Sequence, residues 1–264
     1  MNILDQIHQQ KLVEVKLKKE MCTTKQLEKS IYFESKCVSL KKYITDSHRS
    51  GIIAEFKRKS PSKGFINKYA NAENITIGYM QAGASALSVL TDETFFGANS
   101  SDFTTARKYN YCPILRKDFI IDEFQIIETK SIGADAVLLI AKLLTPKKLK
   151  ELYAFSKQLG LEVLVEYNSQ SEIQENENVI ADLVGINNRD LSNFSINIDN
   201  SIQLASLIDS ESVLVSESGL EDIATIQRLK QHGFKGFLMG EYFMKQPQPA
   251  EACKQFIKNL QLCK

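Results

Sequence analysis

Short apolar runs rich in β-branched residues recur along the chain from about residue 50, and longer segments with helical periodicity separate them. Each run is about five or six residues long, the usual length of a strand buried in a parallel sheet. Strands are therefore predicted at Gly51–Lys57, Ala86–Thr91, Pro113–Lys117, Ala136–Ala141, Leu161–Glu166, Leu183–Asn187, Ser212–Glu217 and Gly236–Met239.

Helices are predicted between these strands, because apolar residues there recur with the spacing of one helix face. Asp122 and Thr145 precede two of the segments and are typical N-cap residues. Several segments end at a glycine that suits a left-handed C-terminal turn, namely Gly83, Gly133, Gly160 and Gly233. The predicted helices are Ala72–Ala82, Glu123–Ile132, Pro146–Gln158, Ser201–Ile208 and Leu220–Gln231.

Eight strand–helix units, spaced about 20 to 35 residues apart, predict an α/β fold of the (β/α)₈ TIM-barrel type rather than an open doubly wound sheet. No GxGxxG motif follows the first strand, which argues against dinucleotide binding. Residues 1–48 precede the first strand and are expected to form one or two added helices. We therefore expect residues 1–264 to be a single barrel domain, with an N-terminal helical extension (1–48) and a barrel (49–264).

Composition and charge exclude several classes of function. The chain has 264 residues and a formal net charge of +1, so no overall field attracts nucleic acid or a membrane. The N-terminal segment is charged throughout and lacks the apolar core of a secretory signal. No apolar run approaches the roughly 18 residues needed to span a bilayer.

Cysteine and histidine spacing indicates neither a disulfide framework nor a metal site. The five cysteines are an odd number without a CxxC pair, and the three histidines form no HExxH set. We therefore expect a reducing cytoplasm and no bound metal. A monomer is expected as well.

Charged and polar side chains stand at the carboxyl ends of the predicted strands, where a barrel of this type places its chemistry. Each of them alone is more often a solvated strand flank than a functional group. Together they bring cations and carboxylates to one barrel mouth, as acid–base chemistry requires, and neighbouring cations would favour a neutral lysine. These residues are Glu55, Lys57, Lys117, Glu166, Asn187 and Arg189.

Glycines follow the seventh and eighth predicted strands directly, in the stretches Ser216–Gly219 and Met239–Glu241. Either glycine alone is equally well explained by a tight turn. Loops at these two positions of a TIM barrel commonly hold a phosphate with backbone N–H groups. The two together therefore favour a phosphorylated small molecule as ligand.

Several motifs resemble those of the indole-3-glycerol phosphate synthase family, and the resemblance covers almost the whole chain. The specific blocks are SPSKG at 60–64, LRKDF at 115–119 and INNRDL at 186–191. The resemblance implies that 1-(2-carboxyphenylamino)-1-deoxyribulose 5-phosphate closes onto its own ketone, loses carbon dioxide and loses water. The product would be indole-3-glycerol phosphate in tryptophan biosynthesis, formed by a carboxy-lyase without cofactor or metal.

The resemblance also implies roles for the charged residues. Lys117 would be the general acid that protonates the ketone oxygen. Lys57 would stabilise developing negative charge and act as the acid in dehydration. Glu166 would be the general base or stabilise a cation, Glu55 would hold Lys57 and contact the sugar hydroxyls, and Asn187 would orient the substrate.

Further residues would bind the substrate rather than react with it. The expected substrate-binding residues are Ser60, Phe119, Arg189, Leu191, Glu217 and Ser218, and the expected phosphate-binding residues are Gly219, Gly240 and Glu241. Glu241 stands where some family members have a small hydroxyl residue. Its carboxylate would have to point away from the phosphate, which its backbone would contact.

The basic stretch Arg58–Gly64 follows the first strand and is expected to be a mobile flap over the substrate. A basic run is usually a solvated surface. Arg58, Lys59 and Lys63 are accordingly expected to be solvated or steering charges.

Two alternatives remain open. A phosphoribosylanthranilate isomerase, a neighbouring phosphate-sugar barrel enzyme, would need a cysteine and an aspartate at strand ends, whereas Cys112 precedes its strand. A non-catalytic binding protein would not need both the acid and the base that Lys57, Lys117 and Glu166 supply. No basic face or aromatic motif indicates RNA binding.

Overall fold

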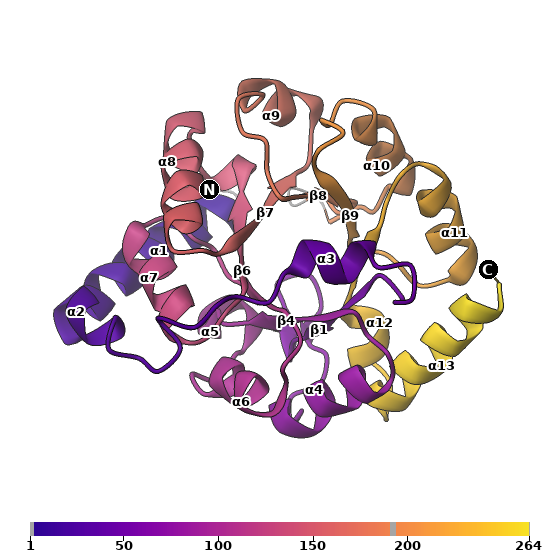
Figure 1. Cartoon of the computed structure of the whole chain (residues 1–264), viewed down its shortest axis with the longest axis horizontal. Coiled ribbons are helices and arrows are strands. Elements are labelled where there is room, and N and C mark those ends of the chain that lie inside the picture. The colour runs from indigo at the N-terminus through magenta and orange to yellow at the C-terminus, as the bar shows by residue number, and fades with distance from the viewer. Residues whose placement is uncertain (1–2, 191–193, 264) are drawn as a thin grey trace.

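The structure is a computed structural model that describes residues 3–190 and 194–263. In this part of the chain, eight parallel strands close into a barrel in the order β1-β10-β9-β8-β7-β6-β5-β4, and helices surround it (Figure 1). The predicted TIM barrel is confirmed, and each predicted strand is placed to within one residue at either end. The strands are β1 (Ile52–Phe56), β4 (Ala86–Leu90), β5 (Ile114–Lys117), β6 (Ala136–Ile140), β7 (Glu162–Tyr167), β8 (Leu183–Asn187), β9 (Val213–Glu217) and β10 (Gly236–Met239).

The outer helices bury one face each against the strands, which are themselves buried on both sides. The sequence pattern did not single out α6, α9 and α13. The outer helices are α4 (Ala72–Gln81), α6 (Asp102–Tyr109), α7 (Glu123–Ser131), α8 (Pro146–Gln158), α9 (Gln170–Glu175), α10 (Ile198–Ala205), α11 (Ile223–Gln231) and α13 (Pro249–Leu262). Shorter turns of helix are α5 (Glu93–Phe96), η1 (Ala141–Leu143) and α12 (Glu241–Met244).

Side-chain caps fix where these helices begin. Asp122 and Thr145 cap α7 and α8 by accepting bonds from backbone N–H groups, as predicted. Helix α10 begins three residues before its predicted start, because Asn197 is its N-cap, and α11 begins later than predicted, because Asp222 caps it. The glycines predicted at helix ends all have left-handed φ values between 75° and 93°, namely Gly83, Gly133, Gly160 and Gly233.

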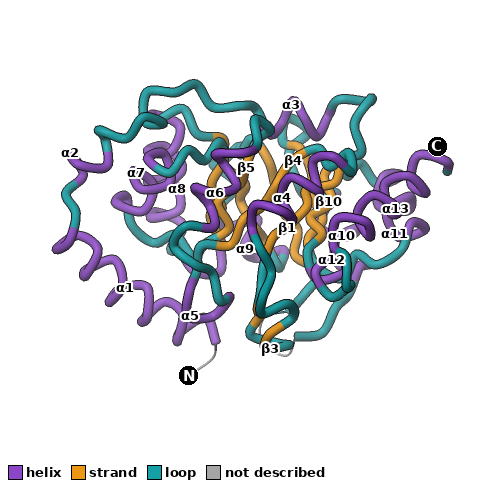
Figure 2. Tube along the Cα trace, turned by 90° about the horizontal axis from the view of Figure 1, so that it is seen from below, coloured by secondary structure: helices purple, strands orange, loops and turns teal. Residues whose placement is uncertain are grey.

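The described part of the N-terminal extension contains three helices, not one or two: α1 (Ile3–Met21), α2 (Thr24–Leu27) and α3 (Leu40–Thr45). Helix α3 lies across one end of the barrel and α1 lies toward the other end (Figure 2). Leu4 and Ile7 of α1, and Leu40 and Ile44 of α3, join the apolar side chains that fill the barrel interior. The extension therefore contributes to the core of the barrel at both ends. None of the described helices is both long and apolar enough to cross a membrane.

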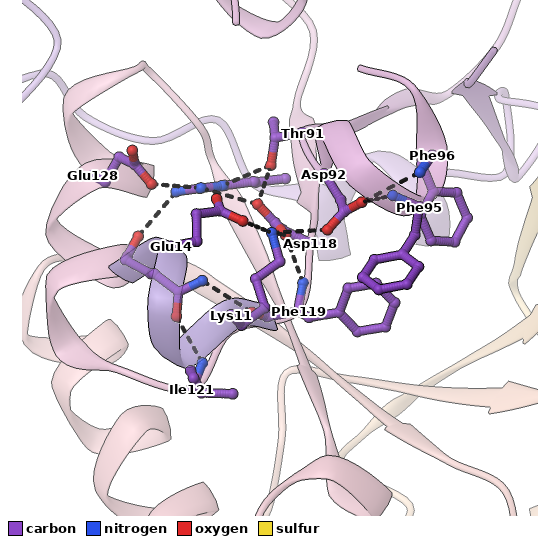
Figure 3. Close-up of polar contacts among 12 residues, drawn as sticks. Lys11, Glu14, Thr91, Asp92, Phe95, Phe96, Asp118, Phe119, Ile121 and Glu128 are labelled. Atoms are coloured by element: carbon purple, nitrogen blue, oxygen red, sulfur yellow. Dashed lines mark hydrogen bonds and ion pairs between the residues drawn. The ribbon is translucent and has the colours of Figure 1, made fainter. Parts of the chain in front are cut away.

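A buried ion cluster fixes α1 to the carboxyl end of the barrel. The Nζ atom of Lys11 lies 2.9 Å from Asp92 and 2.8 Å from Asp118, and none of the three side chains is exposed. Asp92 and Asp118 follow β4 and β5, and the rings of Phe96 and Phe119 lie beside them (Figure 3). Burial lowers the pKa of Lys11, but the nearby carboxylates outweigh it and raise that pKa above its usual value. Lys11 is therefore charged where it is buried.

The stretch after β1 forms a small hairpin of β2 (Lys59–Ser60) and β3 (Gly64–Phe65). The prediction that Arg58 is solvated is wrong. Its side chain is buried, with Nη2 2.8 Å from Asp102 Oδ1 and Nε donating to the Ala70 carbonyl at 3.1 Å. A buried carboxylate from α6 pairs with the Arg58 guanidinium, which anchors the base of the hairpin.

Candidate active site

One pocket at the carboxyl end of the barrel collects every described residue predicted to form the site. It is lined by Glu55, Lys57, Ser60, Lys117, Phe119, Glu166, Asn187, Arg189, Glu217, Ser218, Gly219, Gly240 and Glu241. Leu191 lies outside the described residues. Side chains far apart in sequence therefore share one cavity, because parallel strands present their carboxyl ends at the same rim.

Lys117 is the central cation of this pocket. It ends β5, and its Nζ atom lies 2.9 Å from Glu166 Oε2 and 2.8 Å from Glu217 Oε2. Glu166 lies on β7 and Glu217 ends β9. Asn187, which ends β8, donates from Nδ2 to Glu166 Oε1 at 3.0 Å. One ammonium thus bridges two carboxylates, one of which an amide also orients.

The expectation of a neutral lysine is wrong for Lys117. Burial alone would lower its pKa, but the negative charges of Glu166, Glu217 and Glu55 outweigh burial and raise that pKa above its usual value. The cations predicted to be its neighbours pair with other carboxylates: Lys57 with Glu55 at 2.7 Å and Arg189 with Glu241 at 3.2 Å. Lys117 is therefore protonated and can donate a proton.

Glu217 is a carboxyl group of the pocket whose acidity is much weaker than usual. Burial first, and then the negative charges of Glu166 and Glu55, raise its pKa from 4.5 to about 7 against the opposing effect of Lys117. Its Oε1 atom is buried without a hydrogen-bond partner. A Cβ atom at Gly185 would lie 2.2 Å from that oxygen, so the glycine on β8 makes room for it.

We expect the free energy of unfolding to fall as the pH rises between about 5 and 8. Folded Glu217 keeps its proton up to about pH 7, whereas the unfolded chain releases it near 4.5. The folded state binds more protons in this window, so stability decreases with pH, by about 1–3 kcal/mol from this group. Urea unfolding across the pH range measures the slope.

The Glu217→Gln variant is the control for this slope and should show a flatter one. Lys117 titrates above the window and Asp118 below it, because their pKa values are raised and lowered respectively. Other buried carboxyls such as Glu172, whose pKa burial also raises, remain in both proteins. Equal slopes in the wild type and the variant would contradict the assignment.

Glu55 and Lys57 form the second ion pair of the pocket, and both point inward from the end of β1 as predicted. Apart from allowing a ligand to approach, the glycine at position 240 avoids a clash with Glu55. A Cβ atom there would lie 2.6 Å from Glu55 Oε1 and 2.9 Å from Glu55 Cβ. The absence of a side chain at Gly240 therefore keeps Glu55 in position against Lys57.

Gly240→Ala should lower kcat by about ten- to a hundredfold, because small displacements of site residues are costly. The new methyl group would push Glu55 away from Lys57. Overpacking should also lower the free energy of unfolding by about 1–3 kcal/mol. Thermal and chemical unfolding of both proteins give the stability loss. A double-mutant cycle with Glu55→Gly tests the cause, because glycine removes both the carboxyl group and the Cβ atom that the new methyl group would meet, so the stability loss should shrink. An undiminished loss in that background would place the clash elsewhere.

The turn after β9 has two residues in the left-handed backbone conformation, and both line the pocket. Ser218 and Gly219 both have left-handed φ values, 68° and 70°. Asn188 donates from Nδ2 to the Ser218 carbonyl at 2.8 Å and holds the turn. At Gly219 a Cβ atom would lie 2.4 Å from Ile196 Cγ2, so a side chain does not fit. The loop after β10 begins with Gly240 and leads into α12.

A family model described as indole-3-glycerol phosphate synthase matches residues 4–256. The chain belongs to the indole-3-glycerol phosphate synthase family. The enzyme of that name from Bacteroides thetaiotaomicron is 48% identical over 260 residues, covering 98% of this chain and 99% of that protein. The one from Aliarcobacter butzleri is 39% identical over 261 residues, covering 98% of this chain and 99% of that protein. The resemblance found in the motifs is confirmed.

A solved structure supports the fold. 3-Hexulose-6-phosphate synthase from Salmonella typhimurium superposes with a TM-score of 0.62 at 14% identity, covering 81% of this chain and 99% of that chain. At such low identity the likeness concerns the barrel alone.

Membership of the indole-3-glycerol phosphate synthase family decides against the isomerase alternative, and the pocket agrees. Among the described residues that line it there is no cysteine. Cys112 lies before β5, at the opposite end of the strand from Lys117. The same family membership decides against the non-catalytic alternative, because the family and its relatives are named for an enzyme activity, indole-3-glycerol phosphate synthase.

The pocket also has an apolar wall that was not predicted from the sequence. Ile3, Leu4 and Ile7 of α1 line the pocket opposite the charged strand ends, together with Phe96 and Phe119. The rings of these two phenylalanines pack 5.9 Å apart. The spacing of the α1 residues, which share one helix face, was the available signal. It could not reveal that this face covers the mouth of the barrel.

Proposed function

We propose that this chain catalyses the reaction named by its family. The substrate would be 1-(2-carboxyphenylamino)-1-deoxyribulose 5-phosphate and the product indole-3-glycerol phosphate. One observation carries the proposal: Lys117 bridges Glu166 and Glu217 inside a pocket whose other wall is apolar. A phosphorylated sugar chain suits the polar side, and an aromatic ring suits the wall formed by α1.

The first chemical step uses Lys117 as general acid. The ring carbon that bears the carboxylate attacks the ketone carbon, and the ketone oxygen takes a proton from Lys117 Nζ to become a hydroxyl group. The carboxylate then leaves as carbon dioxide, and its bonding electrons restore the aromatic ring. The raised pKa of Lys117 keeps the proton available on the lysine until the oxygen becomes basic.

The second step is the loss of water. Lys57 lies 2.7 Å from Glu55 and protonates the leaving hydroxyl group. Glu166 takes a proton from the adjacent carbon, which forms the double bond of the indole ring. Asn187 holds Glu166 in place through the bond at 3.0 Å, and Glu217 stabilises the substrate hydroxyl groups or shares the proton of Lys117.

The phosphate is assigned to the loops after β9 and β10. Ser218, Gly219, Gly240 and the backbone of Glu241 line the same end of the pocket, and Arg189 supplies positive charge there. Ser60, in strand β2 of the hairpin, contacts the substrate at the mouth of the pocket. Phe119 packs against the aromatic ring.

We further propose that the chain works as one monomeric domain in the cytoplasm. Support comes from α1 and α3, whose apolar residues fill the barrel interior. The five cysteines are free thiols, as a reducing compartment favours. Light scattering on the purified protein tests the oligomeric state.

The deciding experiment is to add the carboxyphenylamino-deoxyribulose phosphate to purified protein and follow indole fluorescence. The chain contains no tryptophan, so the background is low. Growth of the signal supports the synthase reaction. A folded protein that gives no signal with saturating substrate would refute it, and isomerase activity and phosphate binding would then be measured on the same sample.

A further inference from the structure

The phosphate end of the pocket already holds a carboxylate. Glu241 Oε2 lies 3.2 Å from Arg189 Nη2, and the two side chains are 25% and 15% exposed. Both line the pocket. The cation best placed to attract a phosphate is therefore paired within the chain.

The same carboxylate reaches the hairpin above the pocket. Glu241 Oε1 lies 4.0 Å from Lys63 Nζ, and Arg189 Nη1 lies 3.5 Å from Ser62 Oγ. Ser62 and Lys63 form the tip between β2 and β3. Arg189 and Glu241 thus connect the loop after β8, the start of α12 and the hairpin.

The backbone at Glu241 is held in place, so its carboxylate can leave this region only when the side chain rotates. It is the first residue of α12 and directly follows Gly240, whose backbone is packed against Glu55. A dianionic phosphate bound to the backbone of Gly240 and Glu241 would lie near this carboxylate. Two like charges at that separation repel each other.

We propose that Glu241 is a displaceable counter-ion of Arg189, which a substrate phosphate replaces on binding. In the free chain its carboxylate neutralises Arg189 and helps to hold the hairpin tip. When the phosphate arrives, it takes over Arg189 and Lys63, and the carboxylate turns toward solvent. This inference rests on the proposed function for the identity of the ligand.

The consequence is selectivity against small free anions. Inorganic phosphate must displace Glu241 without help from other contacts, whereas the full substrate also gains the apolar wall and the ion pairs of Lys57 and Lys117. Glu241 therefore weakens the binding of any anion and leaves the chemical step almost untouched. Its removal should change KM more than kcat.

The test is calorimetric titration of inorganic phosphate into the full-length wild type and Glu241→Gln. The glutamine keeps the size and removes the charge, and it should bind phosphate about tenfold more tightly. KM for the substrate should fall by a similar factor, with kcat changed less than about threefold. Glu241→Ser serves as a second variant if the glutamine protein does not fold.

Glu251→Gln is the matched control, because Glu251 lies on α13, is not among the described residues that line the pocket, and pairs with Lys254 at 3.8 Å. It should leave phosphate affinity unchanged. In an Arg189→Gln background, Glu241→Gln should lose most of its effect, as a coupled pair requires.

Phosphate affinity in Glu241→Gln that equals or falls below that of the wild type overturns the inference, and so does an undetectable affinity in both proteins. Because the titration needs no turnover, it tests the counter-ion role of Glu241 separately from the synthase reaction. If the protein binds phosphate but forms no indole-3-glycerol phosphate, the synthase reaction is refuted and the role of Glu241 is still tested. Turnover without tighter binding in the variant refutes only the counter-ion role.

Discussion

Lys117→Ala should lower kcat by about a thousandfold or more, the range expected when a positioned general acid is removed. No other described side chain can take its place between Glu166 and Glu217, since Lys57 is paired with Glu55. The protein should still fold, because Glu217, with its pKa already raised, can protonate when the lysine charge is absent. Indole fluorescence under saturating substrate gives kcat, and circular dichroism gives the melting temperature.

Lys245→Ala is the matched control, because Lys245 is an exposed lysine that pairs with Glu221 at 2.9 Å and is not among the described residues that line the pocket. Its kcat should stay close to that of the wild type. Glu166→Gln should lose activity at the dehydration step, so the ring-closed, decarboxylated intermediate should accumulate in rapid-quench analysis. Residual activity of Lys117→Ala within about tenfold of the wild type would remove Lys117 as the general acid.

Lys11→Met should lower the free energy of unfolding by about 3–5 kcal/mol, because it leaves the buried Asp92 carboxylate without its cation and Asp118 paired only with Arg116. Asp92 and Asp118 are unexposed, and Lys11 is paired with both. Asp92 also accepts backbone N–H bonds from Phe95 and Phe96 and Asp118 one from Phe119, so the loops after β4 and β5 should loosen with α1 (Figure 3). Guanidinium unfolding measures the change.

Lys18→Met is the control on the same helix. Lys18 pairs with Glu14 and Glu128 but is 35% exposed, so its loss should cost less than about 1 kcal/mol. Lys11→Met combined with Asp92→Asn should recover part of the lost stability, because Asp92 is then no longer a buried unpaired charge and Asp118 keeps Arg116. If Lys11→Met costs no more than Lys18→Met, the ion cluster does not hold α1.

The barrel and most of the site could be predicted because their signals are local. Apolar runs marked all eight barrel strands, and a strand end in a parallel barrel fixes the rim to which its last residue belongs. Glu55, Lys57, Lys117, Glu166 and Asn187 were placed in one pocket on this argument, and they line it. The helix starts at Ile198 and Ile223 were missed because the capping side chains Asn197 and Asp222 were not weighed.

Partners across the barrel could not be predicted from sequence. Lys117 is 49 residues from Glu166 and 100 residues from Glu217, and nothing local shows that carboxylates rather than cations surround it. The direction of its pKa shift was wrong for that reason. The sequence predicts a solvated Arg58 because its partner Asp102 lies on a helix that the hydrophobic pattern does not single out.

The sequence by itself determined the strands, the rim on which the reactive side chains stand and the family to which the chain belongs, because periodicity and motifs act over a few neighbouring residues. Only the tertiary structure decided which charges are buried, which are paired and how acidic they are. It placed Lys11 between two aspartates and α1 over the pocket, and it set Glu241 against Arg189. These outcomes depend on distances between segments remote in sequence, since burial and Coulomb energy are set by what the folded chain brings together.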